Sequence, residues 1–240
     1  MPPKKIKINE SNEMINFYEL KKVQKFLTKS HNPNYEKHHI KVPFRSIIIG
    51  SSGAGKTNLI NNIIHEMKDT FNHLYIVCQA QEPLYDLLLC QIPDNMITIF
   101  YGLDSYKKFK EEDYYGQSLI IFDDMVNEKD QKCIQEMFIR GRKIGGGCSL
   151  MYLTQAYFEV PKIIRLQCQY VFIIKISALR DLNMILSEYS LGETKQQLNE
   201  MYKYCCSGQK FGSTFLIDLE AGQDKTYRRN LREYLNPKDF

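Results

Sequence analysis

The feature that most constrains this chain is a glycine-rich loop, G-x-x-x-x-G-K-T, from Gly50 to Thr57. The apolar run 46–49 before it predicts a buried strand, and apolar residues at helical spacing after it predict a helix near 56–68. The glycines let backbone N–H groups close around a polyphosphate, and the helix N-terminus adds a favourable dipole. Lys56 can reach the β- and γ-phosphates, and the Thr57 hydroxyl can ligate Mg²⁺. The sequence therefore predicts a nucleoside triphosphate site formed by Gly50, Ser51, Ser52, Gly53, Ala54, Gly55, Lys56, Thr57 and Asn58.

Length and composition are consistent with one α/β domain and a small appendage. The 240 residues are 43% hydrophobic, enough for a substantial core. We expect no membrane span, because no apolar run approaches the roughly 20 residues that a spanning helix needs. The seven cysteines form no CxxC pair and show no zinc-like spacing with histidine. This usage indicates a reducing intracellular compartment.

Charge is concentrated at the N-terminus, where residues 1–45 hold ten Lys/Arg against four Asp/Glu, a net charge of +6, so the rest of the chain is slightly acidic and the total is +4. Two interpretations stay open for this segment: contact with nucleic acid, or a solvated helix and linker. An amphipathic helix is expected over 14–27. We expect residues 1–40 to form a basic tail with a short helix, 41–220 the ATPase core, and 221–240 a C-terminal tail.

Strand and helix patterns alternate from residue 46 onward. This alternation predicts an α/β fold with a mostly parallel sheet covered by helices on both faces. Together with the phosphate loop, it resembles the P-loop NTPases of the RecA/ASCE-like class. Strands are expected at 46–50, 73–78, 97–101, 118–123, 148–154, 169–176 and 213–219. Helices are expected near 56–68, 83–90, 104–111, 128–142, 161–166 and 179–205, the last broken at Gly192.

Two carboxylates follow the apolar strand that begins at Ser118. Ligand sites of parallel sheets lie at strand C-termini, so Asp123 and Asp124 should emerge beside the phosphate loop. Asp123 is placed to hold the Mg²⁺ shell, directly or through water. Asp124 is a candidate to orient or deprotonate the attacking water. A strand-end turn or helix cap is the alternative for an isolated Asp-Asp pair.

A second polar strand end follows the apolar residues 150–153. A glutamine there, Gln155, can hydrogen-bond the γ-phosphate or the lytic water. Ahead of that strand, Arg140 and Arg142 end a predicted helix. Cations are favourable at a helix C-terminus, but either arginine could instead act as a finger on a neighbouring subunit's γ-phosphate, with Arg142 the first choice.

The ordered set of motifs resembles the viral DNA-packaging ATPases of the FtsK–HerA superfamily, above all those of nucleocytoplasmic large DNA viruses and virophages. Many members of the superfamily carry Glu where this chain has Asp124. The matching motifs cover roughly residues 40–180 and are Pro43–Leu59, Glu82–Tyr85, the Asp123-Asp124 strand end, Gly141–Lys143 and Leu153–Gln155.

This resemblance implies a homo-oligomeric ring that uses ATP and Mg²⁺ to drive double-stranded DNA into a preformed capsid. It also implies Asp124 as the acidic catalytic residue and an arginine supplied in trans. Capsid proteins would be further partners. The expected place is the virus assembly site in the host cytoplasm, with association with the virion. DNA would be held by its phosphates, for which Lys107, Lys108 and Lys110 are candidates, although a solvated helix face accounts for them as well.

Other classes of P-loop protein make different demands on the sequence. Another DNA-dependent ATPase, such as a helicase or a DNA pump, is the main alternative. A nucleotide switch would carry a base-specificity motif such as N-K-x-D, which the chain lacks. A small-molecule kinase would need an arginine-bearing lid over a second substrate.

Overall fold

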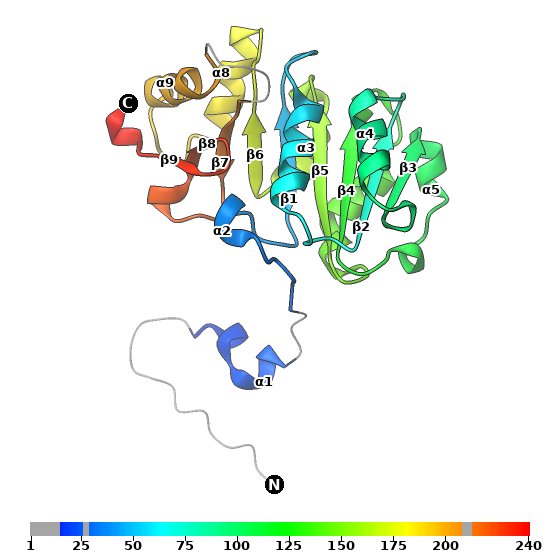
Figure 1. Cartoon of the computed structure of the whole chain (residues 1–240). Helices are drawn as coiled ribbons and strands as arrows, with labels where there is room; N and C mark the ends of the chain where they lie inside the picture. Colours follow the sequence, from blue (N-terminus) through cyan, green and yellow to red (C-terminus); the bar gives the residue numbers. More distant parts are fainter. Residues whose placement is uncertain (1–14, 26–28, 208–212) are drawn as a thin grey trace.

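A nine-stranded sheet organises the chain in the computed structural model, which describes residues 15–25, 29–207 and 213–240 (Figure 1). Its strands are β1 (Arg45–Ile49), β2 (His73–Cys78), β3 (Ile97–Tyr101), β4 (Ser118–Asp123), β5 (Cys148–Thr154), β6 (Tyr170–Ile173), β7 (Phe215–Asp218), β8 (Tyr227–Arg229) and β9 (Glu233–Leu235). They lie in the order β3-β2-β4-β5-β1-β6-β7-β8-β9. In this spatial order, the first six strands, from β3 through β1 to β6, pair in parallel, and the strands from β6 to β9 pair antiparallel. The predicted mostly parallel sheet is confirmed.

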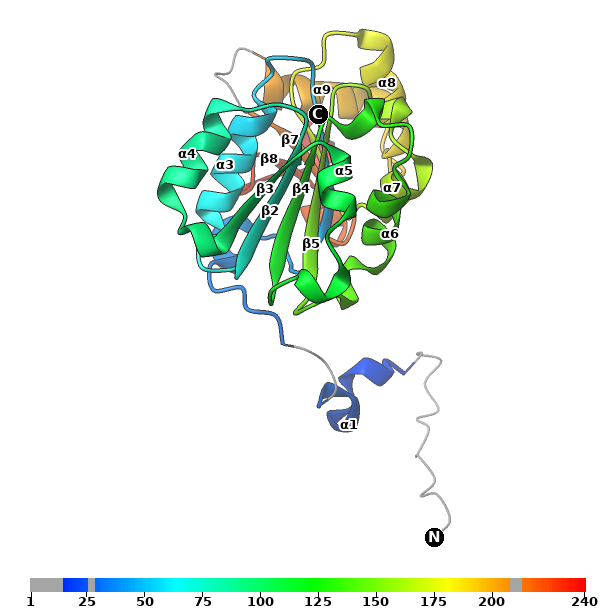
Figure 2. The same ribbon diagram turned by 90° about the vertical axis from the view of Figure 1, so that its right-hand side faces the viewer.

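Helices cover both faces of this sheet, as a parallel sheet with apolar strands requires (Figure 2). The α-helices are α1 (Lys21–Gln24), α2 (Tyr35–His38), α3 (Lys56–Glu66), α4 (Pro83–Gln91), α5 (Leu103–Lys107), α6 (Lys132–Arg140), α7 (Lys162–Gln167), α8 (Leu179–Glu188) and α9 (Lys195–Cys206). Short 3-10 helices are η1 (Phe17–Glu19), η2 (Asp94–Met96), η3 (Glu111–Asp113), η4 (Met125–Asn127), η5 (Gly141–Lys143), η6 (Tyr157–Glu159), η7 (Gln223–Lys225) and η8 (Pro237–Asp239).

The buried apolar side chains form two clusters, one on each face. One cluster joins α3 and α4 to alternate strand residues such as Ile48 and Ile121. The other joins α5 to α9 to the intervening residues, such as Ile47 and Phe122. This two-residue alternation decides which face each strand-end side chain meets.

The central strands agree with the sequence prediction. The strands at 73–78, 97–101, 118–123 and 148–154 have the predicted bounds, and the predicted break at Gly192 separates α8 from α9. Gly192 has φ +99°, a left-handed conformation that glycine adopts without strain. The strand predicted at 169–176 ends at Ile173, because the residues after it leave the sheet and pack against the phosphate loop.

Several helices are shorter than predicted. The helix expected over 128–142 begins at Lys132 and ends at Arg140, where the chain tightens into η5. The helix expected over 104–111 is confined to α5. For the amphipathic helix expected over 14–27, only η1 and α1 form among the described residues, and Phe17 and Leu20 are exposed, so no apolar face is buried there. Phe26 and Leu27 lie outside the described residues.

The C-terminal segment 221–240, expected as a tail, contains β8 and β9 and is part of the sheet. Its anchor is Arg228, whose side chain is 1% exposed and ion-paired with Asp218 on β7. The Arg228 guanidinium also donates to the carbonyls of His38 and His39, both at 3.3 Å. This contact joins the C-terminal hairpin to residues 38–40, of which His38 and Ile40 are buried although they precede the expected boundary. In the described part of the chain, no helix is long and apolar enough to cross a membrane.

Candidate nucleotide-binding site

The loop from Gly50 to Thr57 joins β1 to α3 at the edge where the parallel strands end. Gly55 precedes the first residue of α3 with φ +95°, and Gly53 has φ +70°. Residues with side chains adopt such angles only under strain, so both positions favour glycine. The loop therefore presents backbone N–H groups at the N-terminus of an 11-residue helix, an arrangement that binds phosphate.

Neighbouring strands hold this loop in place. The Gly50 N–H donates to the Thr154 carbonyl at the end of β5, at 3.1 Å. On the other side, the Ser51 N–H donates to the Lys175 carbonyl at 3.0 Å, and the Ser177 N–H donates to Ser51 Oγ at 2.9 Å. The loop is thus hydrogen-bonded to the neighbouring segments on both flanks.

Lys56 is half-buried at the start of α3. Its Nζ donates to the carbonyls of Gly50 at 3.0 Å and Ser51 at 3.3 Å. Burial lowers the pKa of Lys56, while the nearby charges of Asp123 and Asp124 raise it. The ammonium group therefore lies between the loop and the two acids, where a polyphosphate can replace the loop carbonyls as its partner.

Asp123 ends β4, which is separated from β1 by β5 alone. Burial raises the pKa of Asp123, whereas a hydrogen bond from Tyr85 and the charge of Lys56 lower it. The phenol of Tyr85 donates to Asp123 Oδ2 at 2.7 Å. The structure thus brings Asp123 and Lys56 together at one edge of the sheet.

Asp124 has an unusual backbone and an unusual side chain. Its φ of +55° and ψ of +44° are left-handed, a conformation that Asp adopts more readily than most residues but that still stores strain. Its Oδ2 accepts a 3.3 Å hydrogen bond from Gln155 Nε2, and its Oδ1 is buried without a partner among the described residues. A strained carboxylate with a free oxygen beside a phosphate loop is typical of a functional residue.

The oxygen atoms at this edge suit a magnesium ion bound through a nucleotide. The donors are the Thr57 hydroxyl and the carboxylates of Asp123 and Asp124, all hard oxygen ligands. No group of three or more His, Cys, Asp or Glu side chains among the described residues could hold a metal ion by itself. Mg²⁺ commonly uses one or two protein oxygens and completes its shell with phosphates and water, so the donor set fits.

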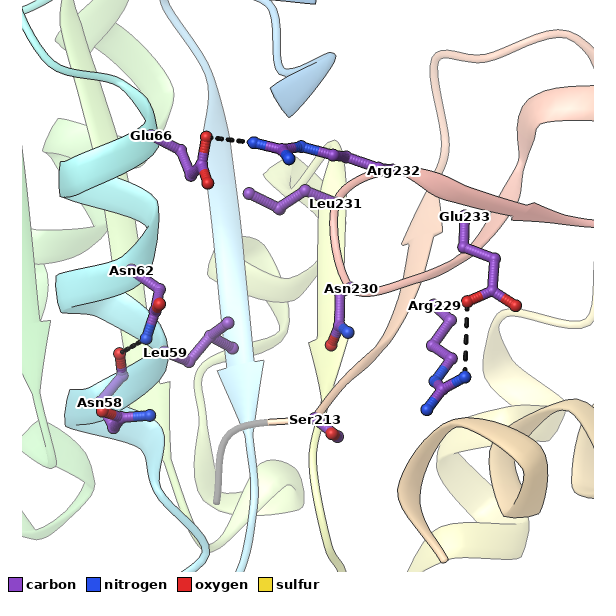
Figure 3. Close-up of a pocket in the computed structure, with 10 residues that line it drawn as sticks. All are labelled: Asn58, Leu59, Asn62, Glu66, Ser213, Arg229, Asn230, Leu231, Arg232 and Glu233. Carbon is purple, nitrogen blue, oxygen red and sulfur yellow. Dashed lines mark hydrogen bonds and ion pairs between the residues drawn. The ribbon is translucent and has the colours of Figure 1, made fainter. Parts of the chain in front are cut away.

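Two cavities meet at Asn58. The first, about 500 Å³, lies over the loop and is lined by Gly53, Gly55, Lys56, Thr57, Asn58, Glu82 and Leu84. The second is a groove of about 460 Å³ between α3 and the β8–β9 hairpin (Figure 3). In Figure 3, Asn58, Asn62 and Glu66 lie along α3, and Glu66 forms a 2.5 Å ion pair with Arg232 across the groove.

The sequence profile described as "Poxvirus A32 protein" matches residues 32–221. The chain belongs to the poxvirus A32 protein family. DNA packaging protein OPG160 of Variola virus is 27% identical to it over an alignment of 174 residues that covers 67% of this chain and 63% of that protein. The same protein of Vaccinia virus matches to the same extent, so the matched region spans less than two thirds of these relatives. The predicted resemblance to viral packaging ATPases is confirmed as a family relationship.

Solved structures share the fold of this A32 family member. The genome packaging NTPase B204 of Sulfolobus turreted icosahedral virus 2, in complex with ATPγS, has a TM-score of 0.56 at 15% identity, over 80% of this chain and 98% of that one. EssC ATPases 2 and 3 from Geobacillus thermodenitrificans have a TM-score of 0.53 at 14% identity, over 83% and 40% respectively. The predicted P-loop fold is confirmed.

The two arginines of this A32 family member lie away from its phosphate loop. Because β4 and β5 are parallel, α6 carries the chain back to the opposite edge of the sheet, where Arg140 and Arg142 follow. Arg140 forms a 2.6 Å ion pair with Glu111. Burial lowers the pKa of Arg45 at the start of β1, and the nearby charge of Arg142 lowers it further. Neither arginine lines the cavity over the loop of its own chain.

Two residues at the site had no role assigned from sequence. Glu82 lines the loop cavity, and Tyr85 contacts Asp123. Both belong to the motif Glu82–Tyr85 that contributed to the family resemblance. The signal available was their place in the segment that follows β2, because strand ends of a parallel sheet converge on the ligand.

Proposed function

We propose that this A32 family member is an ATP-driven motor that moves double-stranded DNA into a preformed capsid. The observation that carries the proposal is the convergence of Lys56, Asp123 and Asp124 at one sheet edge, in a chain related to DNA packaging proteins. Such an arrangement supplies the positioning and electrostatic stabilisation that phosphoryl transfer needs.

Each site residue has a distinct part in hydrolysis. The loop amides and Lys56 bind the β- and γ-phosphates, and Asn58 continues this contact toward the nucleoside. Thr57 and Asp123 would hold Mg²⁺, which would neutralise charge on the phosphates. Asp124 accepts the proton of the attacking water or orients it, since one of its carboxylate oxygens has no hydrogen-bond partner in the part of the chain that the structure describes. Gln155 holds Asp124 in position and can sense the γ-phosphate.

The nucleoside end of ATP enters the groove of Figure 3. The cavity over the loop reaches Glu82 and Leu84 on the side of β4, whereas the groove reaches β8 and β9 on the other side of β1. Asn58 belongs to both. A triphosphate centred on the loop, with its metal toward Asp123, therefore directs its ribose and base into the groove.

A ring of identical subunits accounts for the position of the arginines. Arg142 and Arg140 lie at the opposite end of the parallel strands from the phosphate loop, so we expect neither to contact the γ-phosphate of its own chain. Both side chains are exposed and available to a neighbouring subunit. An arginine supplied in trans stabilises the transferring phosphoryl group and couples hydrolysis to movement between subunits. The motor holds the DNA through its phosphates. It binds capsid proteins at the virus assembly site in the host cytoplasm.

The test combines ATP hydrolysis, duplex translocation and particle mass. We expect duplex DNA to increase the rate of ATP hydrolysis. Translocation along the duplex should displace a third-strand oligonucleotide bound to it as a triplex. The particle mass should correspond to a closed ring. Lys56→Ala should abolish all nucleotide-dependent signals, while Lys162→Ala, at an exposed lysine, serves as the control. Unwinding of forked DNA without duplex translocation would favour a helicase and contradict the proposal.

Mixed rings test the arginine. Arg142→Ala subunits should regain hydrolysis when mixed with Lys56→Ala subunits, because a Lys56→Ala neighbour still supplies its arginine to the intact phosphate loop of an Arg142→Ala subunit. Failure of the mixture, with both variants assembled at wild-type mass, would count against action in trans.

A further inference from the structure

The hydroxyl of Tyr85 is the structural feature that the proposed function leaves unused. Tyr85 lies in the first turn of α4, is 1% exposed, and packs in the cluster on the α3–α4 face. Among the described residues, it is the one side chain that donates a hydrogen bond to Asp123. A phenylalanine would fill the same apolar space, so packing alone does not require the hydroxyl.

Strand geometry explains why these two groups meet. Leu119, Ile121 and Asp123 alternate along β4, and the first two belong to the cluster on the α3–α4 face. Asp123 therefore points toward α4, where the buried phenol needs a polar partner. Burial and the neighbouring carboxylate raise the pKa of Tyr85 well above its ordinary value, so the phenol remains protonated and donates. The bond occupies Oδ2 and leaves Oδ1 for a metal or its water.

The turn that carries Tyr85 is also tied to the phosphate loop. Asn61 on α3 donates to the Leu84 carbonyl at 3.2 Å. The Tyr85 N–H donates to the Glu82 carbonyl at 2.8 Å, and Glu82 and Leu84 line the cavity over the loop. One short segment thus contacts the helix that follows the phosphate loop and the acid at the end of β4.

We propose that Tyr85 is a positioning residue that fixes the Asp123 carboxylate and thereby sets the Mg²⁺ affinity of the nucleotide-bound protein. This inference rests on the proposed role of Asp123 in holding Mg²⁺. Hydrogen-bonded partners of metal-ligating carboxylates orient them, and their loss commonly lowers metal affinity by 10- to 100-fold. Tyr85 does not contact the phosphates in this arrangement, so its effect should appear only when the metal is present.

The test is Tyr85→Phe, read by ATPγS binding as a function of Mg²⁺ concentration. We expect the half-saturating Mg²⁺ concentration to rise about tenfold or more. ATPγS affinity in EDTA should stay within twofold of the wild type. Tyr106→Phe is the matched control, because it removes a buried hydroxyl, bonded to Tyr114 at 2.6 Å, on the opposite face of the sheet. In an Asp123→Asn background, Tyr85→Phe should change the Mg²⁺ requirement by less than twofold.

Three results would overturn the inference. An unchanged Mg²⁺ requirement would show that the hydroxyl does not position Asp123. An equal loss of ATPγS affinity with and without Mg²⁺, or loss of the fold in Tyr85→Phe alone, would make Tyr85 a packing residue. If wild-type protein binds ATPγS with no dependence on Mg²⁺, the proposed role of Asp123 fails first, which distinguishes the two failures.

Discussion

Asp124 allows the roles of charge and backbone strain at the site to be separated. Asp124→Asn removes the negative charge but keeps a residue that tolerates the left-handed backbone, here with φ +55°. A positioned general base contributes about 10²- to 10⁴-fold in rate, which corresponds to roughly 3–5 kcal/mol of activation free energy. We therefore expect hydrolysis to fall by that factor while ATPγS binding remains within threefold.

The stability of the same variants gives an independent readout. The charge of Asp124 contributes to raising the pKa of Asp123, so its removal relieves repulsion between two acids. The same charge attracts Lys56, so the two effects oppose each other and Asp124→Asn should lie within about 1 kcal/mol of the wild type in stability. Asp124→Ala keeps the left-handed backbone but replaces Asp with a residue that adopts it less readily, at a cost of about 1 kcal/mol, which lowers Tm by roughly 2–4 °C in a protein of this size.

Asp69 provides the matched control, because it is exposed and also has a positive φ, +65°. Asp69→Ala should lower Tm to a similar extent without changing hydrolysis. Steady-state phosphate release and thermal unfolding with and without ATPγS measure these quantities. Retention of more than a tenth of wild-type turnover in Asp124→Asn, or loss of its ATPγS binding, would refute the assigned role.

Two further predictions concern the buried polar groups outside the site. Burial lowers the pKa of His38 from 6.5 to about 4. As the pH falls, His38 is therefore protonated near pH 6.5 in the unfolded chain but only near pH 4 in the folded protein. The free energy of unfolding should fall by about 2 kcal/mol through this group between pH 7.5 and pH 5, and urea unfolding of His38→Asn should lack that component. Arg228→Met leaves the Asp218 carboxylate buried without its ion-pair partner and should lower the free energy of unfolding by about 3–5 kcal/mol. The control Arg180→Met, at an exposed position, should lower it by less than about 0.5 kcal/mol.

The parts of the site that sequence predicted are those with a local pattern. The phosphate loop needs glycines at fixed positions, and its flanking strand and helix are contiguous with it. Asp123 follows a continuously apolar strand, and such strands are buried in parallel sheets, so its place at the carboxyl edge follows from the chain direction. The central strands have the predicted bounds for the same reason.

The parts that sequence did not predict depend on contacts between distant segments. β8 and β9 are three-residue strands with charged side chains, and their place in the sheet depends on Arg228 reaching Asp218 and the carbonyls of residues 38 and 39. The hydrogen bond from Tyr85 to Asp123 joins residues 38 positions apart, which no local pattern encodes.

A crystal structure with ATPγS and Mn²⁺ in place of Mg²⁺ would test the site directly, because Mn²⁺ gives an anomalous signal. The account predicts the triphosphate on the amides of Gly53 to Thr57 and an anomalous peak at about 2.1 Å from the Thr57 hydroxyl, in contact with Asp123 directly or through one water. A triphosphate bound away from the loop, or a metal beyond the reach of a bridging water from Asp123, would contradict it.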